Sequence, residues 1–498
     1  MSILRTKSID ALIAAAEDPG KTLRRTLGPW SLTALGIGAV IGSGIFILTG
    51  TAAAGEMLSY KSILHAPILD LLRYGSQAFS TIGRPGAGPA ISLSFLLTAV
   101  ACSFAALCYA ELASMIPIAG SAYTYAYATL GEIVAWIIGW DLILEYAVSN
   151  MAVAVGFSAY LNDILDNTFG WHLPARFAGP PIVEGQFTGA WFNISALIIL
   201  LILTWVLVRG VRESARTNNA MVAIKIVAIL IFVFGAARAV NTANWHPFLP
   251  NGFSGVLTGS AIVFFTYIGF DSVSTAAEEC HRPQRDLPFG IIMTLVVCAL
   301  LYIAVALVLT GIARYDTLNN AAPVANALKA LGFNGIRQWV SIGAILGMVS
   351  SLLVFQYGQA RIWFAMSRDG LLPKAFSKIH PVHRTPHVST WIAGLAVGIP
   401  AGILDIGTFA DLANIGTLFA FIIVSAGVIV LRRTQPHRAR GFRVPGGTWL
   451  PLISIAFCLV LMMALPLETW VRFFVWLLIG FAIYFPFGRK HSALARES

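Results

Sequence analysis

A glycine-rich run near the N-terminus contains the residues best suited to chemistry. Four glycines fall within nine residues, from Gly36 to Gly44, inside an apolar stretch between Trp30 and Ala54. The stretch is long enough to cross a bilayer, yet glycines weaken a helix and free its backbone groups. Unpaired backbone groups in hydrocarbon are costly, so such a break persists only where it lines a cavity or meets a ligand. The run therefore predicts an unwound membrane helix whose N–H groups bind an anion.

A second broken helix is predicted at residues 264–271, where Gly269 and Asp271 follow an aromatic run. Interrupted helices five spans apart are typical of inverted-repeat transporters, in which the substrate lies between the breaks. Close helix packing through glycines is the alternative. N–H groups at the first break and carbonyl groups at the second would bind the two poles of an α-amino acid. The substrate side chain would then contact Phe265, Tyr267 and Ile268.

Lys225 lies in the apolar run 221–228, with no acidic residue nearby in its own span. Desolvation disfavours the charged form of a lysine, so a buried lysine can bind and release a proton near neutral pH. It could also occupy the place of a sodium ion. The alternative is a lysine that extends along the helix to the cytoplasmic interface.

Other polar residues inside expected spans are weaker candidates. Asp141 and Glu145 share one helix face at i, i+4. Glu145 is the candidate for the cavity, and Asp141 is expected to cap or pair near an interface. Asp271 is expected to hold the second break open and to take part in proton coupling. Ser350 and Ser351 could supply oxygens to sodium, although hydroxyl bonds to their own helix are favoured.

The composition indicates a polytopic membrane protein. The 498 residues are 57% hydrophobic and 11% charged. Soluble domains carry about 25% charged residues. The net charge of +10 could suggest nucleic acid, but the distribution of the basic residues favours the positive-inside rule instead. No HExxH or P-loop motif occurs, and no cysteine or histidine cluster suggests a metal. We expect neither an enzyme nor a metal site.

Hydropathy predicts an all-α fold with twelve spans and both termini in the cytoplasm. Most of the 33 Lys and Arg residues then lie on the cytoplasmic side. The expected spans are residues 30–54, 89–116, 130–161, 191–208, 219–240, 254–277, 287–312, 336–366, 387–403, 408–431, 449–465 and 470–487. The expected divisions are a cytoplasmic segment 1–27, a first repeat 28–240, a second repeat 241–432, two further spans 433–487 and a tail 488–498. Residues 56–88 form an amphipathic insert expected to lie on the outer surface.

Several motifs resemble the amino acid–polyamine–organocation superfamily and, within it, the cationic amino acid transporter family. The similar segments are GIGAVIGSGIFILTG from Gly36, GPAISLSFLL from Gly88, Glu111-Leu112-Ala113, FFTYIGFDSVSTAAEE from Phe264 and AMSRDGLLP from Ala365. They extend along the chain apart from the outer insert, for which relatives have a short loop.

The resemblance implies a leucine-transporter-type fold, with two inverted five-helix repeats and two extra helices, and secondary amino acid transport. It implies that Ile41, Gly42, Ser43 and Gly44 bind the carboxylate. Phe265, Thr266 and Ile268 would contact the amine and the side chain. It also implies that Lys225 stands in place of sodium and is linked to protons. Ser43 and Thr266 stand where other members often have Thr or Ala.

The sequence thus predicts a proton-coupled importer of L-amino acids in the plasma membrane, which is the inner membrane in bacteria. The proton would be the coupling ion; sodium is less favoured and no cofactor is expected. An amino acid exchanger or polyamine carrier on the same fold is the nearest alternative. A nontransporting amino acid receptor is the alternative from another class. A partner protein for the outer insert is unknown.

Overall fold

The computed structural model describes residues 5–16, 27–56, 83–118, 120–166, 170–183, 186–209, 212–320, 322–383, 385–404 and 406–493. Within these ranges the chain is mostly helical, with two short antiparallel strand pairs. Most of the outer insert lies outside the described residues, as do parts of the terminal segments. The expected placement of the insert therefore stays a prediction.

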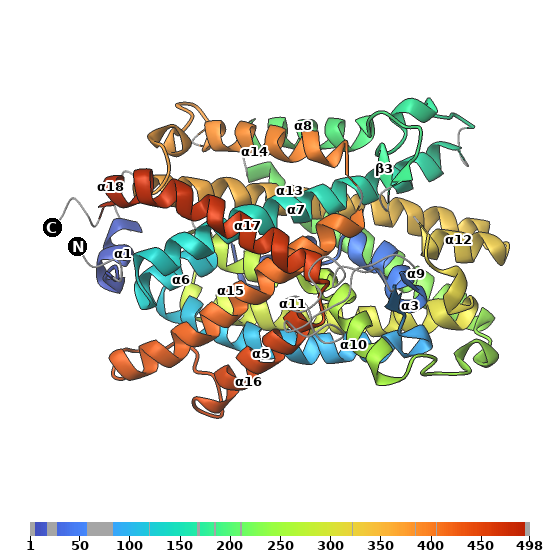
Figure 1. The fold of residues 1–498 in the computed structure, drawn as a ribbon, viewed down its shortest axis with the longest axis horizontal. Helices are drawn as coiled ribbons and strands as arrows, with labels where there is room; N and C mark the ends of the chain where they lie inside the picture. Colours follow the sequence, from blue (N-terminus) through green and yellow to red (C-terminus); the bar gives the residue numbers. More distant parts are fainter. Residues whose placement is uncertain are drawn as a thin grey trace, which may run out of the picture.

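The helices run along the long axis of the molecule (Figure 1). The α-helices are α1 (Ile9–Ala16), α2 (Pro29–Val40), α3 (Thr49–Ala54), α5 (Ile91–Met115), α6 (Ser121–Thr129), α7 (Glu132–Ile164), α8 (Ile194–Arg209), α9 (Arg212–Ala236), α10 (Gly252–Val263), α11 (Pro283–Ile312), α12 (Pro323–Ala330), α13 (Asn334–Arg368), α14 (His387–Ala401), α15 (Ile406–Thr434), α16 (Trp449–Met463), α17 (Leu467–Ile483) and α18 (Arg489–His491). The strand pairs are β1 (Gly55–Glu56) with β2 (Arg84–Pro85) and β3 (Ile182–Val183) with β4 (Gln186–Phe187).

Eight helices in the described part of the chain are long and apolar enough to cross a membrane. The bent pair α2 and α3 makes a ninth candidate when it is counted as one span. The shorter apolar helices α8, α14 and α16 fall where the sequence predicts further spans. The predicted class, an all-α protein with several membrane-spanning helices, is confirmed.

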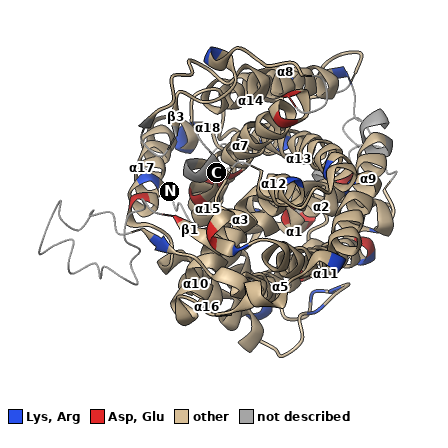
Figure 2. Cartoon of the chain, turned by 90° about the vertical axis from the view of Figure 1, so that its right-hand side faces the viewer, with Lys and Arg blue, Asp and Glu red and all other residues tan. Residues whose placement is uncertain are grey.

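The outside of the bundle is apolar. Large hydrophobic side chains such as Phe234 on α9, Leu300 on α11 and Leu478 on α17 are 72%, 66% and 66% exposed. Charged residues are sparse when the helices are viewed end on (Figure 2). A soluble monomer rarely exposes such extended apolar surface, so these faces contact lipid.

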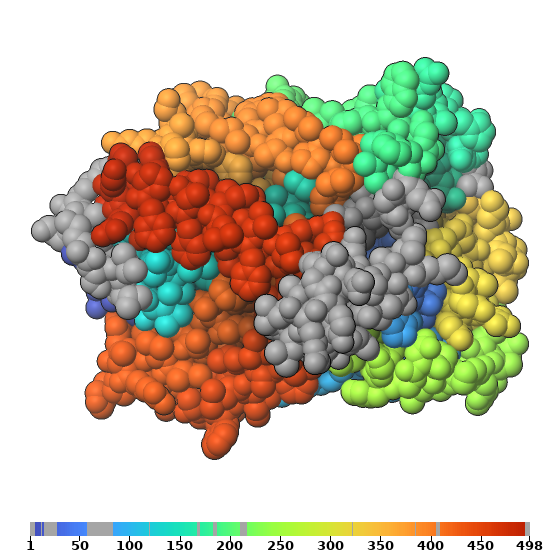
Figure 3. Space-filling view, in the orientation of Figure 1, coloured from blue at the N-terminus to red at the C-terminus, as the bar shows by residue number. Residues whose placement is uncertain are grey.

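The C-terminal helices cover one side of the bundle. Helix α17 packs against α7 and α15, and α16 packs against α5 and α15. Figure 3 shows this part of the chain, in red and orange, on the surface. Helices α1 and α18 lie at the same end of the molecule (Figure 1). Inside the bundle, α7 packs against α13 and α5 packs against α11.

Both predicted helix breaks are present. Helix α2 ends at Val40, and the chain resumes as a π-helical turn, η1 (Gly44–Leu48), before α3, with a bend of 44° between the halves. Helix α10 passes into a 3-10 turn, η8 (Phe264–Tyr267). Ile268 is extended, Gly269 has a φ of +118°, and a 3-10 helix, η9 (Phe270–Glu279), follows.

The two breaks lie against each other. A Cβ atom at Gly44 would be 2.8 Å from Cγ2 of Thr266, and one at Gly269 would be 2.8 Å from Cβ of Ala39. Only residues without side chains allow this approach, because real Cβ atoms do not come so near their neighbours. Two segments that lie far apart in the sequence thus share one centre.

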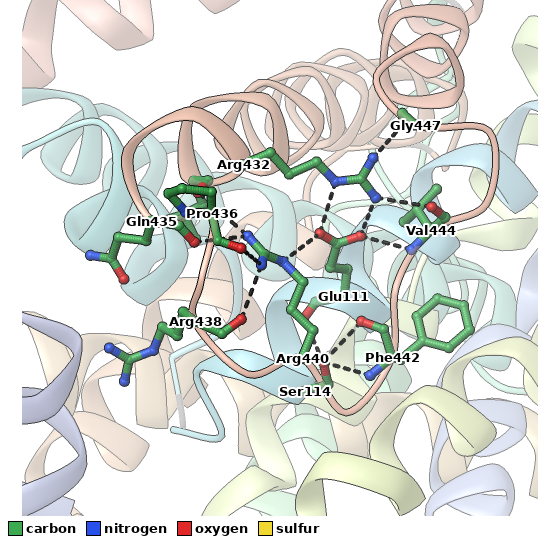
Figure 4. A network of polar contacts seen from close by, with 11 residues as sticks. Glu111, Ser114, Arg432, Gln435, Pro436, Arg438, Arg440, Phe442, Val444 and Gly447 are labelled. Carbon is green, nitrogen blue, oxygen red and sulfur yellow. Dashed lines mark hydrogen bonds and ion pairs between the residues drawn. The ribbon is translucent and has the colours of Figure 1, made fainter.

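A buried ionic network joins the ends of α5 and α15 to the loop after α15 (Figure 4). The Glu111 carboxylate is 1% exposed and accepts hydrogen bonds from Arg432 at 2.5 and 3.0 Å, from Arg440 at 3.2 Å and from the Val444 N–H at 2.7 Å. Ser114, one turn further along α5, accepts from the Phe442 N–H. The motif residue Glu111 therefore holds the loop between α15 and α16.

We expect Gly269→Ala to destabilise the protein strongly. The left-handed backbone costs a side-chain residue about 1–2 kcal/mol, and overpacking against Ala39 adds about 1–3 kcal/mol. Gly332→Ala is the matched control, because Gly332 also has a positive φ, +73°, but nothing described lies within 4 Å of its added Cβ. Thermal denaturation of both variants in detergent should show the larger loss for Gly269. Equal losses would mean that the close approach of the breaks contributes nothing.

We expect Glu111→Gln to destabilise the protein by about 3–5 kcal/mol, because two nearly buried guanidinium groups lose their counter-charge. Asp10→Asn removes a carboxylate that also pairs with an arginine, Arg438, but whose side chain is 81% exposed. Solvent screens that pair, so its loss should leave the melting temperature almost unchanged. A similar small shift in both variants would contradict a structural role for Glu111.

Candidate functional site

The first break offers hydrogen-bond donors in a buried place. Ile41 and Ser43 are 0% exposed. The Ile41 N–H donates to the Ile37 carbonyl at 3.0 Å and the Gly42 N–H to the Val40 carbonyl at 3.1 Å. Ser43 and Gly44 begin the second half-helix, so their N–H groups have no acceptor one turn earlier. Of the four residues predicted to bind a carboxylate, Ser43 and Gly44 therefore have N–H groups without an acceptor among the described residues.

Lys225 lies at the centre of the same break. Its side chain is 0% exposed, and its Nζ donates to the Gly38 carbonyl at 2.9 Å, the Ile41 carbonyl at 2.8 Å and Ser350 Oγ at 3.0 Å. The alternative in which Lys225 extends to the interface is wrong. All three acceptors are uncharged oxygens, the kind of ligand that a sodium ion also takes.

Ser350 and Ser351 also bind the first break. Ser350 Oγ and Ser351 Oγ lie 3.1 and 2.8 Å from the Gly38 carbonyl, and Ser351 Oγ lies 3.2 Å from the Ile41 carbonyl. Ser351 also reaches Gly347 O in its own helix at 3.2 Å. The expectation that bonds to their own helix dominate is wrong, since both hydroxyl groups satisfy carbonyls freed in another span.

Tyr302 joins the two breaks. Its hydroxyl lies 2.9 Å from the Val40 carbonyl at the first break and 2.9 Å from the Thr266 carbonyl at the second. One hydroxyl carries one proton, so the two carbonyls compete for it. The sequence offered no signal for Tyr302, because nothing in its own apolar span sets this tyrosine apart.

The second break supplies carbonyl groups. The Phe265 carbonyl accepts from the Ile268 N–H at 3.2 Å, and Thr266 Oγ1 donates to Val263 O at 2.6 Å. A carbonyl oxygen has two lone pairs, so those of Phe265 and Thr266 can each accept one further bond. The Tyr267 hydroxyl donates to Phe95 O in α5 at 3.0 Å, and its ring contacts Tyr302. A contact between Tyr267 and substrate stays a prediction.

The acidic candidates lie on η9, which follows the second break, and on α7. Asp271 Oδ2 accepts from Tyr146 at 3.1 Å and from Ser121 at 3.5 Å, which ties η9 to α7 and α6. Glu145 is 2% exposed. Asp141 is 0% exposed, and neither of its carboxylate oxygens has a hydrogen-bond partner among the described residues. The expectation that Asp141 caps or pairs near an interface is wrong.

The site is closed toward both ends of the bundle. Phe265, the most exposed of the expected side-chain contacts, is 5% exposed. At one end, Arg84 Nη1 lies 3.1 Å from Glu56 and 2.9 Å from Asp411, so β2 is tied to α15. The guanidinium is buried, and the two carboxylates raise the pKa of Arg84 although burial acts in the opposite direction.

Two ion pairs close the end where α1 and α18 lie. Lys7 Nζ lies 2.8 Å from Asp369 Oδ1, and Tyr123 donates to Oδ2 of the same carboxylate at 2.7 Å. Arg361 and Tyr357 on α13 both donate to Glu279 at the end of η9. The contacts of Glu279 hold the end of η9 against α13, and those of Asp369 tie the end of α13 to α6 and to the N-terminal segment.

Comparison with known proteins identifies the family. The profile of the family described as "Amino acid permease" matches residues 27–484. The branched-chain amino acid permease BcaP of Bacillus subtilis is 46% identical over 495 residues, which cover 99% of both chains. The methylthioribose transporter of the same organism is 45% identical over 493 residues, again 99% of both chains. The chloroplastic cationic amino acid transporter 9 of Arabidopsis thaliana is 33% identical over 565 residues, 99% of this chain and 93% of the relative. With its helix breaks and apolar outer surface, the chain is a multi-pass membrane protein and belongs to the amino acid permease family.

Proposed function

We propose that the protein is a secondary active transporter that imports L-amino acids with protons by alternating access. One observation carries the proposal: the Lys225 ammonium is bonded to two carbonyls, of Gly38 and Ile41, that immediately precede the free N–H groups of the first break. A group that can gain or lose a proton is thereby joined directly to the expected carboxylate site.

The two breaks together match the charges of an α-amino acid. The free N–H groups of Ser43 and Gly44 would bind the carboxylate, and the dipole of the second half-helix, made of η1 and α3, favours a negative charge there. The carbonyls near Phe265, Thr266 and Ile268 would bind the ammonium. The second break touches the first at Gly44 and Thr266, so one small molecule can reach both.

The proton would act through Lys225. A charged lysine holds the Gly38 and Ile41 carbonyls as a sodium ion would, and a neutral lysine loses much of that attraction. Release of the proton would therefore loosen the first break and the carboxylate site together. No cofactor is required, and sodium is disfavoured because the ammonium occupies the cluster of oxygens. Asp271, on the inner half of the second break, is a further candidate for the coupling.

The proposed topology has twelve spans with both termini in the cytoplasm of the inner or plasma membrane. Its support is the bent pair α2 and α3, the eight long helices and the three shorter apolar helices α8, α14 and α16 found in the described residues. Residues 28–240 and 241–432 would be inverted repeats, each beginning with a broken helix. Residues 433–487 would be the two extra spans, which fits the surface position of α16 and α17. Transport would be the whole activity, without an enzymatic step.

Methylthioribose is the second candidate substrate, because a relative named for its transport is as similar to this chain as the branched-chain amino acid permease. This substrate has hydroxyl groups in place of the two charges of an amino acid. Lys225 and both helix breaks could contact either molecule. The substrate therefore depends on whether the site requires the carboxylate and ammonium of an amino acid.

Uptake into proteoliposomes should identify the substrate. Radiolabelled leucine, alanine, arginine, putrescine and methylthioribose would be offered with and without an inward proton gradient. We expect accumulation of at least one L-amino acid, and we expect the gradient to drive it. Counterflow without any gradient effect would indicate an exchanger, and binding without uptake a receptor. Accumulation driven by sodium alone would contradict the proton coupling.

We expect Lys225→Met to abolish gradient-driven accumulation and to flatten the pH dependence of uptake, because methionine has a similar length but no titratable group. Accumulation should fall to the level measured without a gradient. Lys329→Met, on α12 and exposed, is the matched control and should behave like the wild type. Membrane insertion and folding would be checked by size-exclusion chromatography. An unchanged pH profile in a folded Lys225→Met protein would remove Lys225 from the coupling.

A further inference from the structure

Two carboxylates on α7 lie buried without a counter-charge among the described residues. Asp141 is 0% exposed, and neither Oδ1 nor Oδ2 has a hydrogen-bond partner there. Glu145, one turn further on, is 2% exposed, and its Oε2 likewise has no partner in the described chain. Glu145 lies close enough to both Asp141 and Asp271 for their charges to interact. Three acidic groups from α7 and η9 are thus gathered in one buried place.

Helix α15 forms the opposite wall of this place. A Cβ atom at Gly416 would lie 2.7 Å from Asp141 Oδ1, so only glycine leaves room for the carboxyl group. Thr417, the next residue, lies near Glu145. The two acids therefore face a neighbouring helix and not lipid.

Tyrosine hydroxyl groups give an independent sign that something is bound here. Tyr109 on α5 and Tyr125 on α6 are both 0% exposed, and neither hydroxyl has a hydrogen-bond partner in the part of the chain that is described. Tyr109 lies within electrostatic range of Asp271 and Glu145. Buried polar groups are nearly always satisfied, so donors and acceptors without partners around one spot indicate an occupant. A proton on a carboxyl group, and water beside it, would satisfy them.

No cation balances the two α7 carboxylates in the part of the chain that the structure describes. The charged and titratable groups near them are Asp271 from η9, Tyr146 from α7 and Tyr109 from α5, and Tyr125 from α6 lies near Asp271. The described residues also contain no group of three or more His, Cys, Asp or Glu side chains that could hold a metal ion. An ionised carboxylate buried without a partner is prohibitively costly, so such a group takes up a proton instead.

We propose that Asp141 and Glu145 form a second proton-binding site, separate from Lys225, which holds a proton in this closed conformation and releases it toward the cytoplasm. Neighbouring carboxyl groups titrate as a pair, so the proton belongs to both acids. The bond from Tyr146 to Asp271 holds η9 against α7 over this site. When η9 moves away, water reaches the carboxyl groups and the proton leaves.

The binding of a proton by Asp141 and Glu145 is inferred from their burial and lack of partners, whereas its release during the transport cycle rests on the proposed function. Infrared spectroscopy of the full chain in nanodiscs detects protonated carboxyl groups by their carbonyl stretch. We expect this band at neutral pH in the wild type, and we expect Asp141→Asn and Glu145→Gln each to reduce it. Asp163→Asn is the matched control on the same helix, because Asp163 pairs with Arg337 at 2.7 Å and should carry no proton. A wild type without the band, or folded Asp141 and Glu145 variants with an undiminished band, would overturn the site.

Release is tested in proteoliposomes that contain a pH indicator, as protons moved per substrate. We expect Asp141→Asn to lower this ratio while substrate binding persists. An unchanged ratio in a variant that has lost the infrared band would overturn the role in release. A wild type that moves substrate without protons would refute the proposed coupling, and the infrared result would still decide the site.

Discussion

The bilayer leaves no water to satisfy a peptide group, and this constraint governs the whole structure. Each helix break frees N–H and carbonyl groups that must find partners inside the protein. At the first break, Lys225, Ser350 and Ser351 bind the carbonyls of Gly38 and Ile41, and Tyr302 binds that of Val40. The carbonyls are satisfied, while the N–H groups that begin the second half-helix find no acceptor in the described chain. The first break therefore offers only hydrogen-bond donors, which suit a negatively charged group of a ligand.

The same constraint explains how the surroundings are built. Glycines allow the two broken helices to touch, so the carbonyls of one and the N–H groups of the other can act on one substrate. Ion pairs at Glu111, Asp369 and Arg84 lie at the ends of the bundle, where they join the helix ends to loops. In the interior, Lys225 and the acids Asp141 and Glu145 have no oppositely charged partner in the described structure. The charge of each of these three groups therefore depends on whether the group carries a proton.

The sequence predicted the elements that depend on local pattern. Hydropathy located the long apolar helices. The glycine run at Gly36 to Gly44 and Gly269 with Asp271 located the two breaks, because helix weakness is a property of a few adjacent residues. Lys225 was recognised because a charge in an apolar run is conspicuous. The contacts that complete the site could not be predicted in this way. Tyr302 and Ser351 act across the bundle, and a hydroxyl in an apolar span gives no sign of which helix it faces. The prediction for Asp141 was wrong because its surroundings come from α15, which lies far along the chain.

The central claim is that both breaks and Lys225 form one binding unit for an amino acid. A cryo-electron microscopy structure with a transported amino acid bound tests this claim most directly. We expect density for the carboxylate at the N–H groups of Ser43 and Gly44 and for the ammonium at the carbonyls of the second break, with Lys225 still bonded to the Gly38 and Ile41 carbonyls. Density elsewhere in the bundle, with Lys225 detached from the first break and the break unoccupied, would contradict it.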